Sequence, residues 1–319
     1  MADVTHAQIE PTTRCNFACG FCAGRSMRQG DLAWEAFVAF LDAHPGLLHV
    51  ELQGEGEPLL HPRFFDMAAE CRARGIAVGL ITNGSLLDEE RIERLLVAGL
   101  ASIHISMESA DPDQFRRIRG GKFAKVRQGI ARLAARRRAR GQTQPVIGLA
   151  VTVLRETIGA LQGICDLYMA ERLDGGLLVQ PLQTMASYAD RYDPAMTAQL
   201  LAGEDWRRFL ALRAALGQAL PVRRTEDYFY HALYAGFDPA RATCPWLDHG
   251  AYLNATGTVT GCCFMKEETD AFAAAADRAG GDARRAALVG TLDRGIVPAA
   301  CRGCSTAAAI VAARTVSAA

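Results

Sequence analysis

Short apolar or β-branched runs alternate with longer helical patterns from Val4 to about Gln183, and this alternation constrains the fold most strongly. It predicts repeated βα units and a parallel sheet. The predicted strands lie at residues 5–10, 49–53, 77–82, 102–107, 146–153 and 176–181. The predicted helices lie at residues 34–43, 62–74, 88–98, 123–140 and 157–171. Six right-handed βα crossovers curve a sheet into a barrel that remains incomplete, so we expect an α/β fold with a partial (β/α)6 TIM-like barrel.

The pattern changes in the second half of the chain. Residues 184–243 are helical with polar interruptions, which predicts a connector between domains. Residues 251–261 predict a β-hairpin, because a Thr-Gly turn separates two short apolar runs. An Ala-rich helix is predicted at residues 271–287 and a helical tail after Ser305. We therefore expect a barrel domain at 1–183, the connector, and a small C-terminal domain at 244–319.

Charge and cysteine content limit the function classes. The 319 residues carry 35 Lys and Arg against 35 Asp and Glu, so the whole protein lacks the positive field of a nonspecific nucleic-acid binder. No run approaches the roughly 18 apolar residues of a membrane span, and no signal peptide is evident. We expect a cytoplasmic protein with no membrane or nucleic-acid partner. Ten cysteines in such a protein indicate metal binding or catalysis rather than disulfides.

Three cysteines, Cys15, Cys19 and Cys22, follow the first predicted strand with the spacing C-x3-C-x2-C. Iron–sulfur clusters normally take four thiolates, so three would leave one iron of a [4Fe-4S] cluster open to a small molecule. The alternative is a zinc site, which usually closes with a fourth Cys or His at short spacing. The next histidine is His44, so we favour the iron–sulfur interpretation.

This spacing, with Phe21 just before the third cysteine, resembles the signature of the radical S-adenosylmethionine (AdoMet) superfamily. The resemblance implies a [4Fe-4S] cluster that binds AdoMet and cleaves it reductively to a 5'-deoxyadenosyl radical, which abstracts a hydrogen atom from the substrate. It also implies an electron donor such as flavodoxin or ferredoxin. Phe21 is expected among the residues around the cofactor.

Two further motifs at strand ends resemble AdoMet-binding motifs of that superfamily. Gly56-Glu57-Pro58 matches most of its Gly-Gly-Glu-Pro motif, with Glu55 in place of the first glycine. The resemblance implies that this segment receives the ammonium group of AdoMet. Thr82 and Asn83 follow the third predicted strand and resemble the next turn of the family. The carboxyl ends of parallel strands meet at one edge, so we expect these motifs close together.

The fourth predicted strand is expected to complete the cofactor site. Period-two alternation places His104, Ser106 and Glu108 on one face, which we expect to point into the cavity. By resemblance, Ser106 and Glu108 contact AdoMet. Arg119 resembles an arginine that meets the AdoMet carboxylate, and the alternative is an ordinary surface arginine.

A second group of cysteines lies near the C-terminus. Cys244, Gly257 and Cys262, closed by a C-x2-C pair, resemble the SPASM/twitch subfamily, in its shorter twitch form. The expected ligands of one auxiliary [4Fe-4S] cluster are Cys244, Cys262, Cys301 and Cys304. Zinc remains an alternative for these four. Cys263 is then either a packed side chain or a catalytic thiol that donates a hydrogen atom.

These residues favour a radical SAM oxidoreductase of dehydrogenase or peptide-modifying type, as in natural-product or RiPP biosynthesis. The substrate is expected to be a peptide or a small polyol or sugar, with net oxidation through the auxiliary cluster. One alternative is a redox-neutral epimerase with a cysteine hydrogen donor. Another is a noncatalytic iron–sulfur or zinc protein.

Two other segments are candidates for contact with the substrate. Residues 183–192 are either a substrate-facing loop or an interdomain connector. Asp227, Tyr228 and His231 are candidates for an acid–base group. The first predicted strand begins at residue 5, so we expect no N-terminal leader-binding module, which counts against a peptide substrate.

Overall fold

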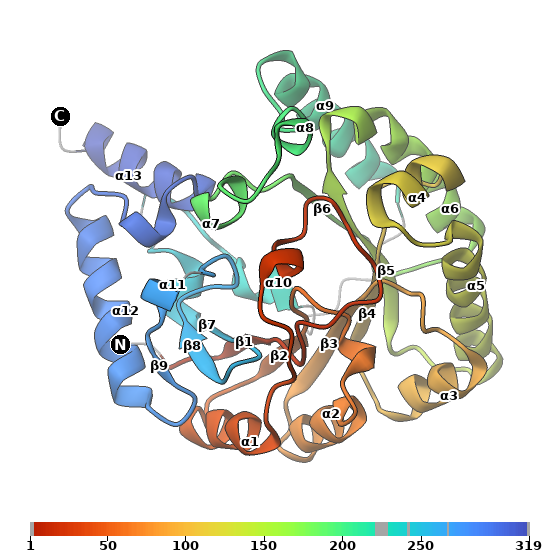
Figure 1. Cartoon of the computed structure of the whole chain (residues 1–319), viewed down its shortest axis with the longest axis horizontal. Coiled ribbons are helices and arrows are strands. Elements are labelled where there is room, and N and C mark those ends of the chain that lie inside the picture. The colour runs from red at the N-terminus through yellow and green to blue at the C-terminus, as the bar shows by residue number, and fades with distance from the viewer. Residues whose placement is uncertain (1–2, 221–228, 241–242, 267, 318–319) are drawn as a thin grey trace.

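Nine strands form a single sheet in the computed structural model, which describes residues 3–220, 229–240, 243–266 and 268–317. From edge to edge the strand order is β6-β5-β4-β3-β2-β1-β7-β8-β9. Strands β1 to β6 are all parallel to their neighbours, and helices lie along the outer side of this curved sheet (Figure 1). The predicted α/β partial barrel is confirmed.

The boundaries of the barrel strands agree with the prediction to within one residue. The strands are β1 (His6–Ile9), β2 (His49–Leu52), β3 (Ala77–Thr82), β4 (Ser102–Ser106), β5 (Val146–Val153), β6 (Leu177–Pro181), β7 (Gly250–Leu253), β8 (Thr258–Thr260) and β9 (Ala273–Ala274). The first helices are α1 (Trp34–Ala43), α2 (Phe64–Ala73), α3 (Glu89–Val97), α4 (Pro112–Arg119), α5 (Phe123–Ala139) and α6 (Leu161–Ala170). The later ones are α7 (Ala186–Ala189), α8 (Pro194–Thr197), α9 (Glu204–Ala219), α10 (Phe229–Leu233), α11 (Pro245–His249), α12 (Arg278–Asp293) and α13 (Ser305–Ser317).

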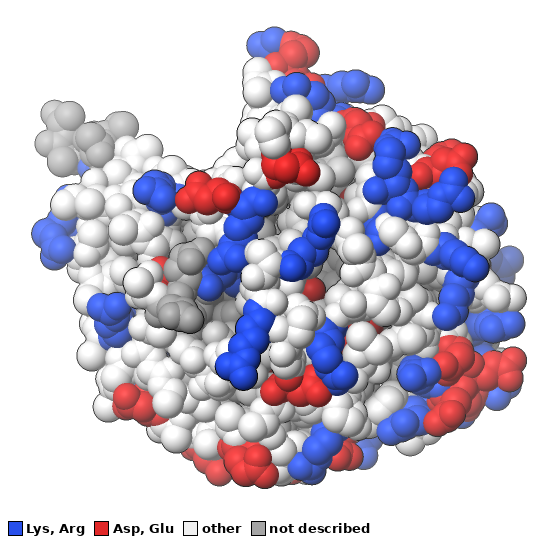
Figure 2. Space-filling view, in the orientation of Figure 1, with Lys and Arg blue, Asp and Glu red and all other residues white. Residues whose placement is uncertain are grey.

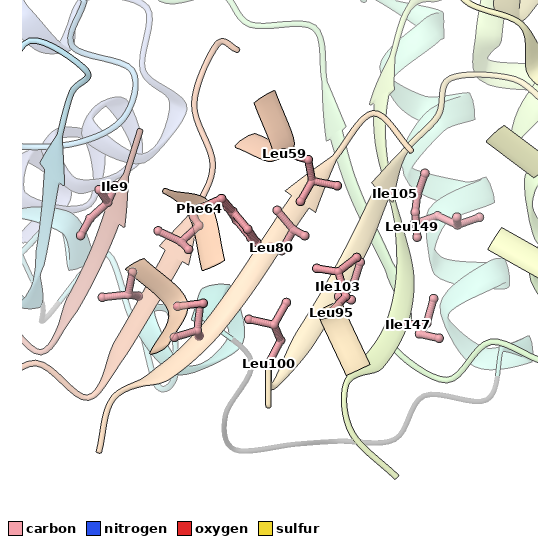
Figure 3. Close-up of a cluster of buried hydrophobic side chains, with 14 of the residues drawn as sticks. Ile9, Leu59, Phe64, Leu80, Leu95, Leu100, Ile103, Ile105, Ile147 and Leu149 are labelled. Atoms are coloured by element: carbon pink, nitrogen blue, oxygen red, sulfur yellow. The ribbon is translucent and has the colours of Figure 1, made fainter. Parts of the chain in front are cut away.

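Alternating side chains give the barrel strands an apolar outer face and a polar inner face. Figure 3 shows the outer face, where Leu80, Ile103 and Ile147 pack towards side chains of the surrounding helices. Each of the three is fully buried, and burying one such side chain stabilises the fold by roughly 1.5–3 kcal/mol. The inner face carries buried polar residues such as Gln8 and Ser102. The outer face of the sheet therefore forms the hydrophobic core together with the helices. The inner face is polar and can form a binding site.

The Ala-rich segment near the C-terminus corrects one prediction. The helix expected at residues 271–287 begins only at Arg278, the first residue of α12, and runs to Asp293. Residues Ala273 and Ala274 instead form β9, which pairs antiparallel with β8. Asp277 ends this strand region and caps the helix by accepting a hydrogen bond of 2.9 Å from the Gly280 N–H. Sheet pairing thus overrides the helical propensity of alanine in that segment.

The C-terminal hairpin is joined directly to the barrel. Strand β7 pairs parallel with β1, and β8 runs back antiparallel beside β7, as the predicted hairpin requires. Gly257 in the turn has a φ of +80°, a conformation that glycine adopts without strain. The hairpin therefore joins the C-terminal segment to the barrel through the pairing of β7 with β1. The division into three domains stays a prediction.

Among the described residues, none of the helices combines the length and apolar character that crossing a bilayer requires.

Candidate active site

A cavity of about 1000 Å³ lies at the carboxyl ends of the barrel strands. Its lining includes residues that end or follow successive strands, among them Gln53, Thr82, Ser106 and Gln183. Figure 2 shows a hollow near the middle of this face, bordered largely by Lys and Arg side chains. In parallel α/β sheets, ligands bind at this end of the strands.

Cys15, Cys19 and Cys22 all line this cavity. Cys15 is exposed, whereas Cys19 is buried, and burial raises the pKa of the Cys19 thiol to about 11. A bound cation reverses this preference because it stabilises the thiolate form. Three thiols along one cavity are the donor set that a [4Fe-4S] cluster with an open iron needs. Among the described residues, no three His, Cys, Asp or Glu side chains lie close enough together for a single metal ion.

Gly56 holds the loop after β2 against the chain that leads into the cysteine loop. A Cβ atom at Gly56 would lie 2.2 Å from the carbonyl oxygen of Thr12 and 2.6 Å from that of Arg14. The Glu57 N–H also donates to the Arg14 carbonyl at 2.9 Å. The segment Gly56-Glu57 therefore fixes the backbone just before Cys15.

Substituting Gly56 by alanine is expected to reduce stability by about 1–3 kcal/mol, since the added methyl group meets backbone atoms that cannot rotate away. Urea unfolding of G56A measures this. Gly30→Ala is the matched control, because a Cβ at Gly30 has nothing within 4 Å. Equal stability of the two variants would contradict the proposed close approach.

Glu57 joins the second and third motifs. Its carboxylate accepts hydrogen bonds from the Thr82 hydroxyl at 2.7 Å, the Asn83 N–H at 2.7 Å and the Leu59 N–H at 3.2 Å. Burial raises the pKa of Glu57, and these three hydrogen bonds act in the opposite direction. The amide of Asn83 in turn lies 3.7 Å from the Cys15 sulfur. Glu57 therefore holds Thr82 and Asn83 in place, and Asn83 contacts the first cysteine of the loop. All three residues line the cavity.

Arg119 and Glu108 form a buried ion pair at the edge of the cavity. The Arg119 Nη2 donates to Glu108 Oε1 at 2.7 Å, and its Nε donates to the other carboxylate oxygen. Arg119 lines the cavity and lies 5.9 Å from the centre of the Phe21 ring. The alternative of an ordinary surface arginine is wrong, because Arg119 is only 5% exposed.

Two of the predicted cofactor-binding residues lie behind the cavity wall. Glu108 does not line the cavity, because its carboxylate is directed at Arg119. Pro58 is buried at the start of a short 3-10 turn, Pro58–Leu60, and also does not line it. The other predicted residues line the cavity together: Phe21, Gly56, Glu57, Thr82, Asn83, Ser106 and Arg119.

The five C-terminal cysteines lie in one buried cluster. The cluster contains Cys262, Cys263 and Cys301, with Cys244 and Cys304 partly buried against it. Cys244 directly precedes α11, and the other four lie in the segments that follow β8 and α12. The four predicted auxiliary ligands therefore lie in or against the same apolar cluster, and their role as ligands stays a prediction.

Cys262 and Cys263 differ in what they face. Cys263 lines the large cavity, whereas Cys262 does not. Burial raises the pKa of Cys262 well above its ordinary value, and the neighbouring Cys263, Cys244 and Cys301 add to this increase. Of the two, Cys263 is thus the residue that faces the cavity, and the choice of Cys262 as the ligand stays a prediction.

The sequence did not single out Lys266, which the fold buries beside the cavity wall. Its ammonium group lies 3.2 Å from a carboxylate oxygen of Glu55, and its side chain is 2% exposed. Tyr188 belongs to residues 183–192, for which a substrate-facing loop and an interdomain connector were both open, and it lines the cavity and donates a hydrogen bond to the same carboxylate. Lys266 follows the apolar residues Phe264 and Met265 but directly precedes a run of acidic residues, so nothing in the sequence marks it as buried. Asp227 and Tyr228 lie outside the described residues, as does the His231 side chain.

Comparisons with known proteins agree with this geometry. The model of the radical SAM superfamily matches residues 9–167. A probable GTP 3',8-cyclase from Methanosarcina mazei is 34% identical over 252 residues, which cover 73% of this chain and 69% of the relative. This chain belongs to the radical SAM superfamily. Members of this superfamily bind AdoMet and a [4Fe-4S] cluster.

Other radical SAM relatives match a shorter part of their length. The tungsten-containing aldehyde ferredoxin oxidoreductase cofactor-modifying protein of Pyrococcus furiosus is 34% identical over 154 residues, 46% of this chain and 43% of that protein. The chain thus spans less than half the length of this curated relative.

Among solved structures, native anSMEcpe with bound AdoMet and the Kp18Cys peptide has a TM-score of 0.67 and 15% identity, with 98% of both chains covered. This likeness shows a shared fold.

Proposed function

We propose that this chain is a twitch-type radical SAM oxidoreductase that abstracts a hydrogen atom from a peptide or a small polyol or sugar, with net oxidation. The observation that carries the proposal is a set of three thiols, Cys15, Cys19 and Cys22, along one cavity of about 1000 Å³. A cavity of this size accommodates a nucleoside cofactor and a further molecule.

In this proposal the chain's own residues hold and orient the cofactors. Cys15, Cys19 and Cys22 hold the first [4Fe-4S] cluster, which with bound AdoMet supplies a 5'-deoxyadenosyl radical. Phe21, Ser106 and Arg119 lie around the nucleoside, and Arg119 provides a cation for its carboxylate. Gly56 and Glu57 fix the backbone that carries the first cysteine.

An auxiliary [4Fe-4S] cluster on Cys244, Cys262, Cys301 and Cys304 is the second part of the proposal. These thiols are gathered in one apolar cluster, where the packing against Trp246 and Tyr252 limits access of water. Such a group accepts the electron that remains on the substrate radical, which accounts for net oxidation. Flavodoxin or ferredoxin is the proposed electron donor for the first cluster.

The lining of the cavity supports a polar substrate. Tyr188, Tyr192 and Tyr234 bring phenol groups to it, and Gln180 and Thr152 add an amide and a hydroxyl group. These groups match the hydroxyl and amide groups of polyols and peptides. Of these two substrate classes, the structural neighbour with a bound peptide favours a peptide.

Anaerobic reconstitution with iron and sulfide tests the proposal. We expect about eight iron atoms for each chain, because two [4Fe-4S] clusters are proposed, and release of 5'-deoxyadenosine from AdoMet after chemical reduction. A protein that takes up zinc alone, or that holds iron yet leaves AdoMet intact under reduction, would disprove the proposal.

An epimerase with a cysteine hydrogen donor is the second candidate, favoured by the position of Cys263 on the cavity wall. Cys262→Ala is expected to lose about four of the eight iron atoms, whereas Cys263→Ala keeps them all. Full turnover of C263A would exclude the thiol donor. Deuterium that passes from solvent into recovered substrate would instead favour epimerisation over oxidation.

A further inference from the structure

A carboxylate, a phenol and an ammonium group meet beside Cys22. The Cys22 thiol donates to Glu55 Oε2 at 3.3 Å and lies 3.4 Å from the Glu55 carbonyl oxygen. On the other carboxylate oxygen, Glu55 accepts the hydroxyl of Tyr188 and faces the Lys266 ammonium group at 3.2 Å. Lys266 also donates to the Tyr252 hydroxyl at 2.9 Å.

These groups come from distant parts of the chain and are shielded from water. Glu55 follows β2, Tyr188 lies in α7 and Lys266 follows the C-terminal hairpin. The side chains of Glu55 and Lys266 are 10% and 2% exposed. Charges in such surroundings are screened far less than charges on the surface, so their effect on a neighbouring group is larger.

The contact between Glu55 and Cys22 changes in character once Cys22 is a ligand. A thiolate on iron has no proton to donate, so its sulfur and the Glu55 carboxylate then face each other as two negative groups. Lys266 supplies the positive charge that offsets this repulsion. One-electron reduction adds a further negative charge to the cluster, which the carboxylate opposes and the ammonium group favours.

We propose that Glu55 and Lys266 are a pair of positioning residues whose opposite charges set the reduction potential of the cluster held by Cys15, Cys19 and Cys22. The inference rests on the proposed function for the existence of that cluster. Glu55 is also the position at which the chain departs from the Gly-Gly-Glu-Pro motif. The acidic residue and the lysine thus form one unit, since a carboxylate in that place without the lysine would be a buried unpaired charge.

The test is a charge cycle on the reconstituted protein, with the midpoint potential measured by redox titration and electron paramagnetic resonance. Removing the carboxylate in E55Q is expected to raise the midpoint potential. Removing the ammonium group in K266M is expected to lower it, and the double variant lies between the two. The signal that changes when AdoMet is added identifies the first cluster and separates it from the auxiliary one.

Two controls distinguish charge from structure. K266R keeps the charge and should stay close to the unmodified protein. Glu204 and Arg207 form an ion pair that is 74% and 77% exposed, so E204Q and R207M should leave the potential unchanged. If K266M does not retain its cluster, the direction in which E55Q shifts the midpoint potential tests the inference alone.

Opposite shifts for the two charge removals support the inference. Shifts of the same sign, no shift, or a lowered potential in E55Q overturn it while the proposed function stands. Failure of the unmodified protein to bind iron overturns the proposed function itself, and the inference falls with it.

Discussion

Cys19→Ala is expected to abolish the release of 5'-deoxyadenosine and to leave about four of eight iron atoms on the reconstituted protein. Cys19 is one of three thiols along the cavity, and each iron of the proposed cluster apart from the open one needs its own thiolate. Losing one thiolate exposes a second iron, so the cluster is no longer held in place for AdoMet. Iron analysis and chromatography of the reaction mixture measure both effects.

Cys165→Ala is the matched control for this variant. Cys165 is also a buried cysteine, but it lies in α6 on the outer side of the barrel. C165A should keep both its iron and its AdoMet cleavage, with only a modest loss of stability from the lost packing. Iron loss of the same size in C165A and C19A would show that the effect is a general response to cysteine removal.

Arg119→Met is expected to destabilise the protein by about 3–5 kcal/mol, because it leaves the Glu108 carboxylate buried without its partner. The side chains of the pair are 7% and 1% exposed. Burial alone would lower the pKa of Arg119, but the adjacent Glu108 carboxylate holds it above its ordinary value. Urea unfolding measures the loss in free energy, and AdoMet binding should weaken in the same variant because Arg119 lines the cavity.

A surface ion pair on the same helix provides the control. Arg116 and Asp113 lie 2.8 Å apart and are 70% and 80% exposed, so R116M should change stability by no more than about 1 kcal/mol. The double variant R119M/E108Q should recover part of the lost stability, since it removes the unpaired charge. If R119M costs as little as R116M, the buried pair does not stabilise the barrel as argued.

Most of the barrel could be predicted because local patterns determine it. Each β1–β6 strand has an apolar outer face that only a helix-covered sheet can bury, so its period-two pattern is visible in the sequence. Helix α4 was missed because Pro112–Arg119 is short and polar, with its two apolar contacts supplied by Phe115 and Ile118. The start of α12 was placed too early because pairing of Ala273–Ala274 with β8 is a tertiary contact that alanine content does not reveal.

In the candidate site, too, local features could be predicted from the sequence, whereas contacts between distant residues could not. Its cysteines and glycines were found from spacing, which is a local property. The partner of Arg119 was not, since Glu108 belongs to a different element and alternation alone suggested that it faces the cavity. Lys266 was missed because its importance comes from Glu55, which lies more than two hundred residues earlier in the chain. Long-range charge pairs of this kind become visible only in the folded chain.

The account depends on an iron atom that the protein leaves without a fourth thiolate at the Cys15–Cys22 loop. The electron paramagnetic resonance spectrum of the reduced, reconstituted protein, recorded before and after addition of AdoMet, tests this most directly. We predict a changed cluster signal with AdoMet and no such change in C19A. A signal that is identical with and without AdoMet in the unmodified protein would contradict an open iron.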